Sequence, residues 1–145
     1  MATVFDVAGY ILRQLGTMST WKLEKLCYYS QAWALAWSDN HPLFDDEFEA
    51  WANGPVCPNL FHEHKGKYTV NIEDFPSANP DTLSEDQKDT IDTVLRYYGS
   101  KDPYWLREQT HAEDPWKNAR GDLPEGAPSH NVISKASMGA YYGAL

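Results

Sequence analysis

Apolar residues repeat every three or four positions along the first forty residues, and this spacing predicts two α-helices. The first covers residues 4–15, and Gly16 supplies a C-terminal stop signal. The second covers residues 20–37, because Ser19 or Thr20 can cap its N-terminus.

The second predicted helix carries a broad stripe of apolar and small residues. The stripe consists of Leu23, Leu26, Cys27, Ser30, Trp33, Ala34 and Trp37. Lys22 and Lys25 fall outside it, so we expect both side chains to point away. Because aromatic residues crowd this helix, we expect it to be central to the core.

After residue 44 the pattern shifts toward alternation of apolar and polar residues. This predicts a short extended or β element within residues 44–56. The sequence Asn53-Gly54-Pro55 predicts a turn there, since Asn and Gly tolerate positive φ and Pro fixes its own. A short helix follows over residues 58–65, and residues 68–72 are a second candidate extended segment.

Further helices are predicted from polar residues that can cap their N-termini. These residues are Ser84, Asp102, Asp114 and Ser134. Residues 121–129 are rich in Pro, Gly and acidic residues and predict a loop. No internal repeat or interdomain linker interrupts the chain. The predicted fold class is therefore mainly α: one compact helical bundle over residues 1–145, with a short extended element.

Composition narrows the function classes. Hydrophobic residues make up 42% of the 145 residues, which is enough for a core and argues against disorder. The formal net charge of -9 would repel the phosphate backbone, which disfavours direct nucleic-acid binding. The same charge attracts a basic protein partner, or it serves only solubility.

The expected location is the cytoplasm. No apolar run approaches the length of a membrane span, and the N-terminus lacks the pattern of a signal peptide. The two cysteines, Cys27 and Cys57, are too few for a secreted disulfide framework. We expect both to be free thiols, and Cys27 to be a small buried hydrophobe.

Cys57, His62 and His64 are close enough in sequence to suggest metal ligands. Two histidines two positions apart on a helix face different directions, however, and no second Cys or His pair completes the set. Surface and capping roles are therefore expected for these residues, and no metal.

Enzymatic chemistry has little support in the sequence. Cys57 with His62 or His111 has the atom types for a thiolate nucleophile, but no helix start behind Cys57 is expected to lower its pKa. The run Asp45-Asp46-Glu47 is typical of a solvated face. No glycine-rich phosphate loop is present. We expect no catalytic residue and no cofactor.

Residues 51–56 admit two interpretations. Trp51 can be a core residue beside an ordinary turn. Alternatively, a rigid turn flanked by Trp51 and Phe61 presents an aromatic surface of the kind that anchors protein interfaces.

The segment THAEDPWKNAR, residues 110–120, also admits two interpretations. In the first, Asp114 caps a helix opened by Pro115 and Trp116 plugs the fold. In the second, His111 and Arg120 belong to a recognition patch.

Three segments together resemble the SocA-like antitoxin family, or Panacea domain. They are LEKLCYYSQAWALAW (residues 23–37), FEAWANGPVCPNLFHEH (residues 48–64) and THAEDPWKNAR. The helix that ends in Tyr97-Tyr98-Gly99 lies between the last two, and the tail from Ile133 to Tyr142 is also similar. The resemblance covers almost the whole chain.

The resemblance implies a mostly helical domain, often phage-associated, that neutralises a toxin from a neighbouring gene by direct binding. It also allows an adaptor that delivers the toxin to a protease, such as a Clp-type protease. The residues that match its motifs, and so are candidates for toxin binding in a hetero-oligomer, are Trp51, Asn53, Gly54, Pro55, Val56, His111, Pro115, Trp116 and Arg120.

Three hypotheses follow from the sequence. The first is an antitoxin without enzymatic activity, and its chain lacks the length and basic charge of an added DNA-binding segment. The second is a phage-associated accessory protein that binds a host factor. The third, a hydrolase that uses Cys57 with His62 or His111, has the least support.

Overall fold

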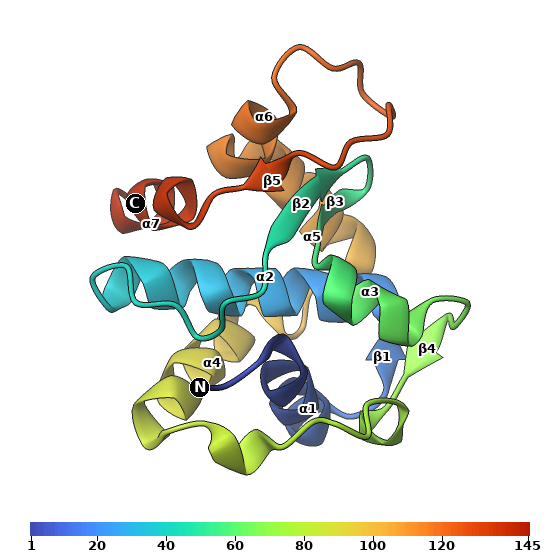
Figure 1. The fold of residues 1–145 in the computed structure, drawn as a ribbon, viewed down its shortest axis with the longest axis vertical. Coiled ribbons are helices and arrows are strands. Elements are labelled where there is room, and N and C mark those ends of the chain that lie inside the picture. The colour runs from blue at the N-terminus through green and yellow to red at the C-terminus, as the bar shows by residue number, and fades with distance from the viewer.

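The computed structural model describes residues 1–145 and is mainly α-helical, as the sequence predicts (Figure 1). Its α-helices are α1 (Val4–Leu15), α2 (Thr20–Trp37), α3 (Pro58–His64), α4 (Glu85–Tyr98), α5 (Pro103–Ala112), α6 (Asp114–Arg120) and α7 (Lys135–Gly143). Two 3-10 helices, η1 (Ile72–Asp74) and η2 (Pro80–Thr82), lie in the connection between α3 and α4.

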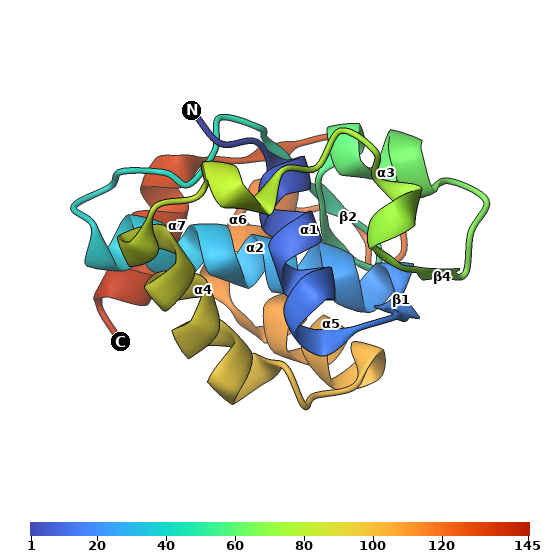
Figure 2. The same cartoon turned by 90° about the horizontal axis from the view of Figure 1, so that it is seen from below.

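Helix α2 crosses the middle of the molecule, with α1 and α4 on one side and α5 and α7 on the other (Figures 1 and 2). Every residue from Leu23 to Ala32 is buried. This confirms that the helix is central to the core. The prediction that Lys25 points away is wrong, because helices cover α2 on several sides and Lys25 is only 1% exposed.

Two small antiparallel sheets accompany the helices. The strands are β1 (Met18–Ser19), β2 (Phe48–Trp51), β3 (Gly54–Val56), β4 (Thr69–Val70) and β5 (Val132–Ile133). Strands β2 and β3 form a hairpin in which Trp51 faces Gly54, and β5 pairs with the other edge of β2. Strand β1 pairs with β4. The extended elements predicted near residues 44–56 and 68–72 are thus confirmed.

Glu113 is buried at the junction of α5 and α6, and it connects this junction to α2 and α7. Its Oε1 accepts hydrogen bonds from the hydroxyls of Tyr29 on α2, at 2.8 Å, and Tyr142 on α7, at 2.7 Å. Glu113 is also the N-cap residue of α6. The predicted cap at Asp114 is therefore wrong by one residue, because Asp114 already belongs to the helix.

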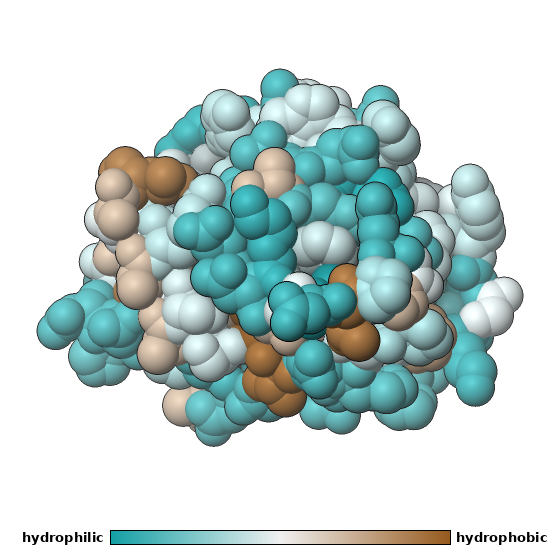
Figure 3. All heavy atoms as spheres, turned by 90° about the horizontal axis from the view of Figure 1, so that it is seen from above, coloured by the Kyte–Doolittle hydropathy of each residue, from teal (hydrophilic) through white to brown (hydrophobic).

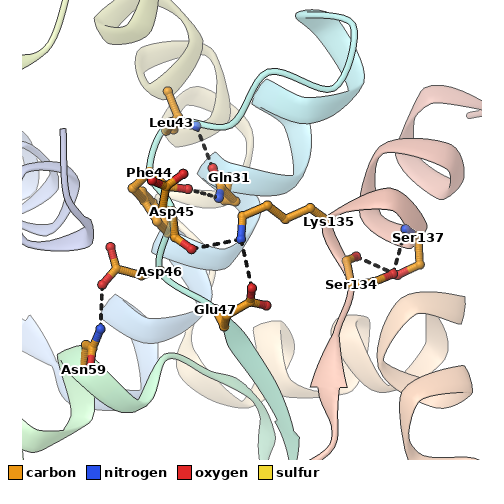
Figure 4. Close-up of polar contacts among 10 residues, drawn as sticks. All are labelled: Gln31, Leu43, Phe44, Asp45, Asp46, Glu47, Asn59, Ser134, Lys135 and Ser137. Atoms are coloured by element: carbon orange, nitrogen blue, oxygen red, sulfur yellow. Dashed lines mark hydrogen bonds and ion pairs between the residues drawn. The ribbon is translucent and has the colours of Figure 1, made fainter. Parts of the chain in front are cut away.

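The connection between α2 and β2 is fixed by polar contacts at both ends (Figure 4). The Gln31 amide accepts from the backbone N–H of Leu43 and donates to the carbonyl of Phe44, both at 2.7 Å. Lys135, at the start of α7, donates to the carbonyl of Asp45. These contacts hold the entry to the β2–β3 hairpin against the helical core.

Candidate protein-binding site

The β2–β3 turn lies directly against helix α2. Gly54 has φ +115, and a Cβ atom at this position would lie 2.5 Å from Lys25 Cε and 3.2 Å from Thr110 Oγ1. A larger residue would therefore meet both a strained backbone and the side chains below it. Glycine lets the turn approach α2 and α5 this closely.

Lys25 is the buried cation under this turn. No protein group accepts a hydrogen bond from its Nζ, which lies 5.3 Å from the centre of the Trp21 ring. Burial lowers the pKa of Lys25 to about 8; the Glu24 carboxylate opposes this shift and the Arg107 guanidinium adds to it. Lys25 still carries a charge at neutral pH.

A pocket of about 220 Å³ opens above Lys25. Its lining contains two aromatic rings and two cationic side chains. It is formed by Trp21, Lys25, Asn53, Pro103, Tyr104 and Arg107. The Arg107 guanidinium contacts the Asn53 side chain at 3.4 Å and pairs with Glu108 at 2.8 Å.

A second pocket of about 310 Å³ lies on the other side of the turn and shares Trp21 and Asn53 with the first. Trp51 and Ala52 form part of its wall. The rest comes from Gly126, Pro128, Ser129 and His130 in the loop between α6 and β5. Trp51 packs against Phe61 with ring centres 4.9 Å apart, so its ring is held in place. The two pockets together flank Asn53.

The segment THAEDPWKNAR, residues 110–120, supports this turn from the core side. Trp116 donates from Nε1 to the carbonyl of Trp51 at 2.9 Å. Arg120 donates to the carbonyls of Ala50, Pro124 and Ala127 at 2.9–3.0 Å. Both side chains are less than 10% exposed. The expected role of Trp116 as a plug of the fold is confirmed, and Arg120 binds backbone rather than a carboxylate.

His111 stacks on Trp116 with ring centres 3.8 Å apart. Burial, with help from the Arg107 guanidinium, lowers the pKa of His111 to about 4. The imidazole is therefore neutral at physiological pH, and its Nε2 has no hydrogen-bond partner in the protein. It serves as an aromatic platform beneath the site, half-buried, and does not add to the local positive charge.

The candidate residues from the sequence thus fall into two groups. Asn53 is exposed, and Trp51 and His111 are half-buried, so these three can touch a partner. The buried group consists of Gly54, Pro55, Val56, Pro115, Trp116 and Arg120. These six residues shape the turn from within, and toxin contact by any of the candidates stays a prediction.

Sequence reasoning missed Trp21, Lys25, Tyr104 and Arg107, which complete the first pocket. One signal was available for Lys25. Between Leu26 and Trp37, helix α2 is almost continuously apolar, as expected of a helix that is buried on every side. A charged residue at the start of such a helix is itself a candidate for burial. Tyr104 and Arg107 gave no comparable signal.

The predicted surface roles of Cys57 and His64 are wrong, because both are buried. The capping role of Cys57 is confirmed, since it is the N-cap residue of α3. His64 Nε2 lies 2.7 Å from Oε2 of Glu24, whose other oxygen accepts from the Cys57 backbone N–H at 2.8 Å. Glu24 on α2 lies between β3 and α3, which explains why both partners face inward. His62 is exposed, as expected. No group of three or more His, Cys, Asp or Glu side chains is placed to hold a metal ion.

The thiol of Cys57 is poorly suited to nucleophilic chemistry. Helix α3 begins immediately behind it at Pro58, which confirms the predicted helix and overturns the expectation that no helix start lies behind Cys57. Burial nevertheless raises the pKa of Cys57 to about 12, more than the hydrogen bonds from the α3 backbone lower it. Cys27 is buried too, and both cysteines are free.

The outer surface is mostly hydrophilic on the side that carries α6 and the following loop. Figure 3 shows this face, where hydrophobic atoms form separate spots and no continuous apolar area. None of the helices combines the length and the hydropathy that a membrane crossing requires.

Comparison with known proteins shows that the sequence matches one family. The model of the family described as "Antitoxin SocA-like, Panacea domain" matches residues 23–117, about two thirds of the chain. The matched region begins just before Lys25 and ends just after Trp116, so it contains most of the first pocket. No curated protein and no solved structure matched the chain. The resemblance seen in the sequence is confirmed: the chain belongs to the SocA-like antitoxin (Panacea domain) family.

Proposed function

We propose that the protein is an antitoxin that neutralises the toxin of a neighbouring gene by binding it directly, without catalysis, in the cytoplasm. The binding surface is the region around the β2–β3 turn, where Trp21, Trp51, Asn53, Tyr104 and Arg107 line the two adjoining pockets. One observation above all supports this assignment. Residues far apart within the matched range, such as Lys25, Asn53 and Tyr104, come together in this one region.

The chemistry of this surface suits a protein partner. Trp, Tyr and Arg are the residues most enriched at the energetic centres of protein interfaces. Trp21 is 37% exposed and Tyr104 is 68% exposed, so both rings are accessible. The braced turn between the pockets is ordered before binding, so less conformational entropy is lost on association.

Coexpression with the adjacent gene tests the proposal. The neighbouring product is expected to arrest growth alone and to be harmless when both proteins are present. A stable complex should be recovered by purification of either protein. If the toxin level stays constant during rescue, binding alone neutralises it. A fall that depends on a Clp-type protease would indicate delivery to proteolysis. A neighbour that is harmless alone, or that is not rescued, would contradict the antitoxin function.

A pair of tyrosine variants locates the binding surface. Tyr104→Ala is expected to weaken toxin binding at least tenfold, because it removes an exposed aromatic wall of the first pocket. Tyr68→Ala is the matched control, since Tyr68 is 80% exposed and lines none of the pockets described above. Circular dichroism should show unchanged helix content in both variants. Equal binding by the two variants would place the interface elsewhere.

A further inference from the structure

The first pocket holds a positive charge that the protein itself does not neutralise. Lys25 is 1% exposed, and its Nζ has no hydrogen-bond partner within the chain. An ammonium group removed from water is stable only when an acceptor or an anion compensates for the lost hydration. Such a group at the base of an open pocket indicates that the compensating group comes from outside.

The neighbouring acidic side chains are already engaged. Glu24 lies next to Lys25 in sequence, but its two oxygens bind His64 and the backbone N–H of Cys57. Glu108 pairs with the Arg107 guanidinium at 2.8 Å, and its side chain is half exposed to solvent. His111 is neutral and cannot compensate for a cation, and the Asp102 carboxylate accepts from the Trp105 N–H at the start of α5. The pocket therefore keeps a net positive charge within a protein whose net charge is -9.

We propose that this pocket binds the carboxylate of one acidic side chain on the bound toxin. This inference rests on the proposed function and deepens it, because it names the chemical group that the site recognises. The Lys25 ammonium and the Arg107 guanidinium donate to the carboxylate oxygens, and the Asn53 amide lies at the pocket's rim. Trp21 and Tyr104 pack against the carbon stem of the Asp or Glu.

The size of the pocket favours a single side chain. Its volume is about 220 Å³. Pockets that enclose whole small-molecule ligands usually reach about 300–1,000 Å³. A carboxylate with its methylene stem fits this space, and the adjoining pocket beyond Asn53 is open to neighbouring residues of the same partner.

The donors of the pocket also favour a carboxylate over a phosphate. Phosphate sites are commonly built from backbone N–H groups at a helix N-terminus. Here the first residue of α5 is Pro103, which has no N–H. The Asp102 carboxylate already accepts from the Trp105 N–H at 2.7 Å, and its negative charge disfavours a dianion more than a monoanion. Because Arg107 is already paired with Glu108, Lys25 is the cation without an acidic partner, and its single charge matches one monovalent carboxylate.

A titration with acetate tests the pocket without any toxin. Sodium acetate replaces sodium chloride at constant ionic strength, and the indole N–H of Trp21 is followed by NMR. We expect a saturable shift with a millimolar dissociation constant. In Lys25→Met the constant should rise at least tenfold, and in Arg107→Gln severalfold. Lys117→Met is the matched control, because it loses the same charge from a half-exposed surface pair with Asp114.

The outcomes of this titration are distinct. The absence of a saturable shift in the wild-type protein would overturn the anion site. A response of Lys25→Met equal to that of the control would do the same. Sodium phosphate is titrated in parallel at the same ionic strength. Phosphate binding at least tenfold tighter than acetate binding would overturn the assignment to a carboxylate.

Carbodiimide cross-linking then examines the complex of the full chain with the neighbouring gene product. This reagent joins an amine to a carboxylate in direct contact, so mass spectrometry should find Lys25 linked to one Asp or Glu of the toxin. A stable complex without this cross-link, and with unchanged affinity in Lys25→Met, would overturn the inference and leave the antitoxin function intact. Failure to form any complex would instead contradict the proposed function, and with it the toxin as the source of the carboxylate.

Discussion

At the scale of single residues, the unusual feature is a set of charged groups buried under a tight turn. Glu24 and Lys25 are neighbours on α2, both at most 1% exposed, yet they differ in how they are compensated. Glu24 has two partners in the protein, whereas Lys25 Nζ has none. We therefore expect replacements at these two positions to change stability in opposite directions.

Lys25→Met should stabilise the isolated protein at neutral pH. The folded-state pKa of about 8 lies below the usual lysine value near 10.5, so folding disfavours the charged form. This destabilisation is fully present below pH 8 and disappears as the pH rises toward the unfolded-state pKa. A shift of this size corresponds to about 3 kcal/mol, as an upper bound. Urea unfolding should therefore show the variant more stable at pH 7 and the difference much smaller at pH 10.

The comparison of wild type with variant removes the contribution of other groups that titrate in this range. Both proteins contain the same cysteines and tyrosines, which also ionise above pH 8 in the unfolded chain. A stability difference that stays constant from pH 7 to pH 10 would contradict the buried, unpaired ammonium.

Glu24→Leu should destabilise the protein by about 3 kcal/mol, because it leaves the Cys57 N–H and His64 without a buried acceptor. Glu24→Gln should cost less, since its amide oxygen still accepts from Cys57. Equilibrium unfolding in urea gives both values. Glu63→Gln, at an exposed position on α3, serves as control and should change stability by less than about 0.5 kcal/mol. Equal stabilities of the Leu and Gln variants would contradict the acceptor role.

At the scale of elements, a buried arginine joins the loop between α6 and β5 to strand β2. Arg120 donates to Pro124 and Ala127 within this loop and to Ala50 in strand β2. Four residues of the same loop form a wall of the second pocket: Gly126, Pro128, Ser129 and His130. The buried guanidinium therefore connects the last turn of α6 to the shape of the binding surface, although it is only 4% exposed itself.

Arg120→Met should loosen this loop while the helices stay folded. Loss of the donors leaves three carbonyls without their partner, and we expect a destabilisation of about 2 kcal/mol. Cleavage after Glu125 by a glutamate-specific protease should become several times faster than in the wild type, with the helix content by circular dichroism unchanged. Lys117→Met, on the same helix, should cleave at the wild-type rate. Unchanged cleavage in Arg120→Met would show that other contacts hold the loop.

Much of the helical framework follows from sequence, because apolar spacing and polar caps are local signals. Ser19, Ser84, Asp102 and Ser134 cap their helices as predicted. The two-residue strands β1 and β5 were not predicted, since such short strands depend on partners far away in the chain. The first pocket could not be predicted from local sequence patterns either. It combines α2, the β2–β3 turn and α5, and only the packed chain brings Lys25 beneath Asn53.

At the scale of the whole molecule, the net charge of -9 and the local positive pocket have separate effects. The overall negative field acts over roughly 10 Å at 0.1 M salt and increases the encounter rate with a basic partner. The pocket acts only at contact, where it can pair with one carboxylate. The overall negative field therefore governs the association rate. The pocket governs the orientation of the bound partner and the lifetime of the complex.

Salt should accordingly slow the association of the complex more than it speeds dissociation. We expect the association rate constant with a basic toxin to fall at least tenfold between 50 mM and 500 mM NaCl, measured by stopped-flow fluorescence. Neutralising the exposed residues Glu85, Asp86 and Asp89 of α4 together should flatten this dependence, although none of them lines the pockets of the candidate site. An association rate that is independent of salt would contradict electrostatic steering.

The unpartnered Nζ of Lys25 has a consequence for discrimination between partners. The desolvation of this ammonium already costs free energy in the free protein, so a protein that covers the pocket without offering an anion recovers none of it. A partner with a carboxylate at that point recovers part of it. The difference in affinity between the two partners then comes from this one contact, and a carboxylate at that position becomes a condition for tight binding.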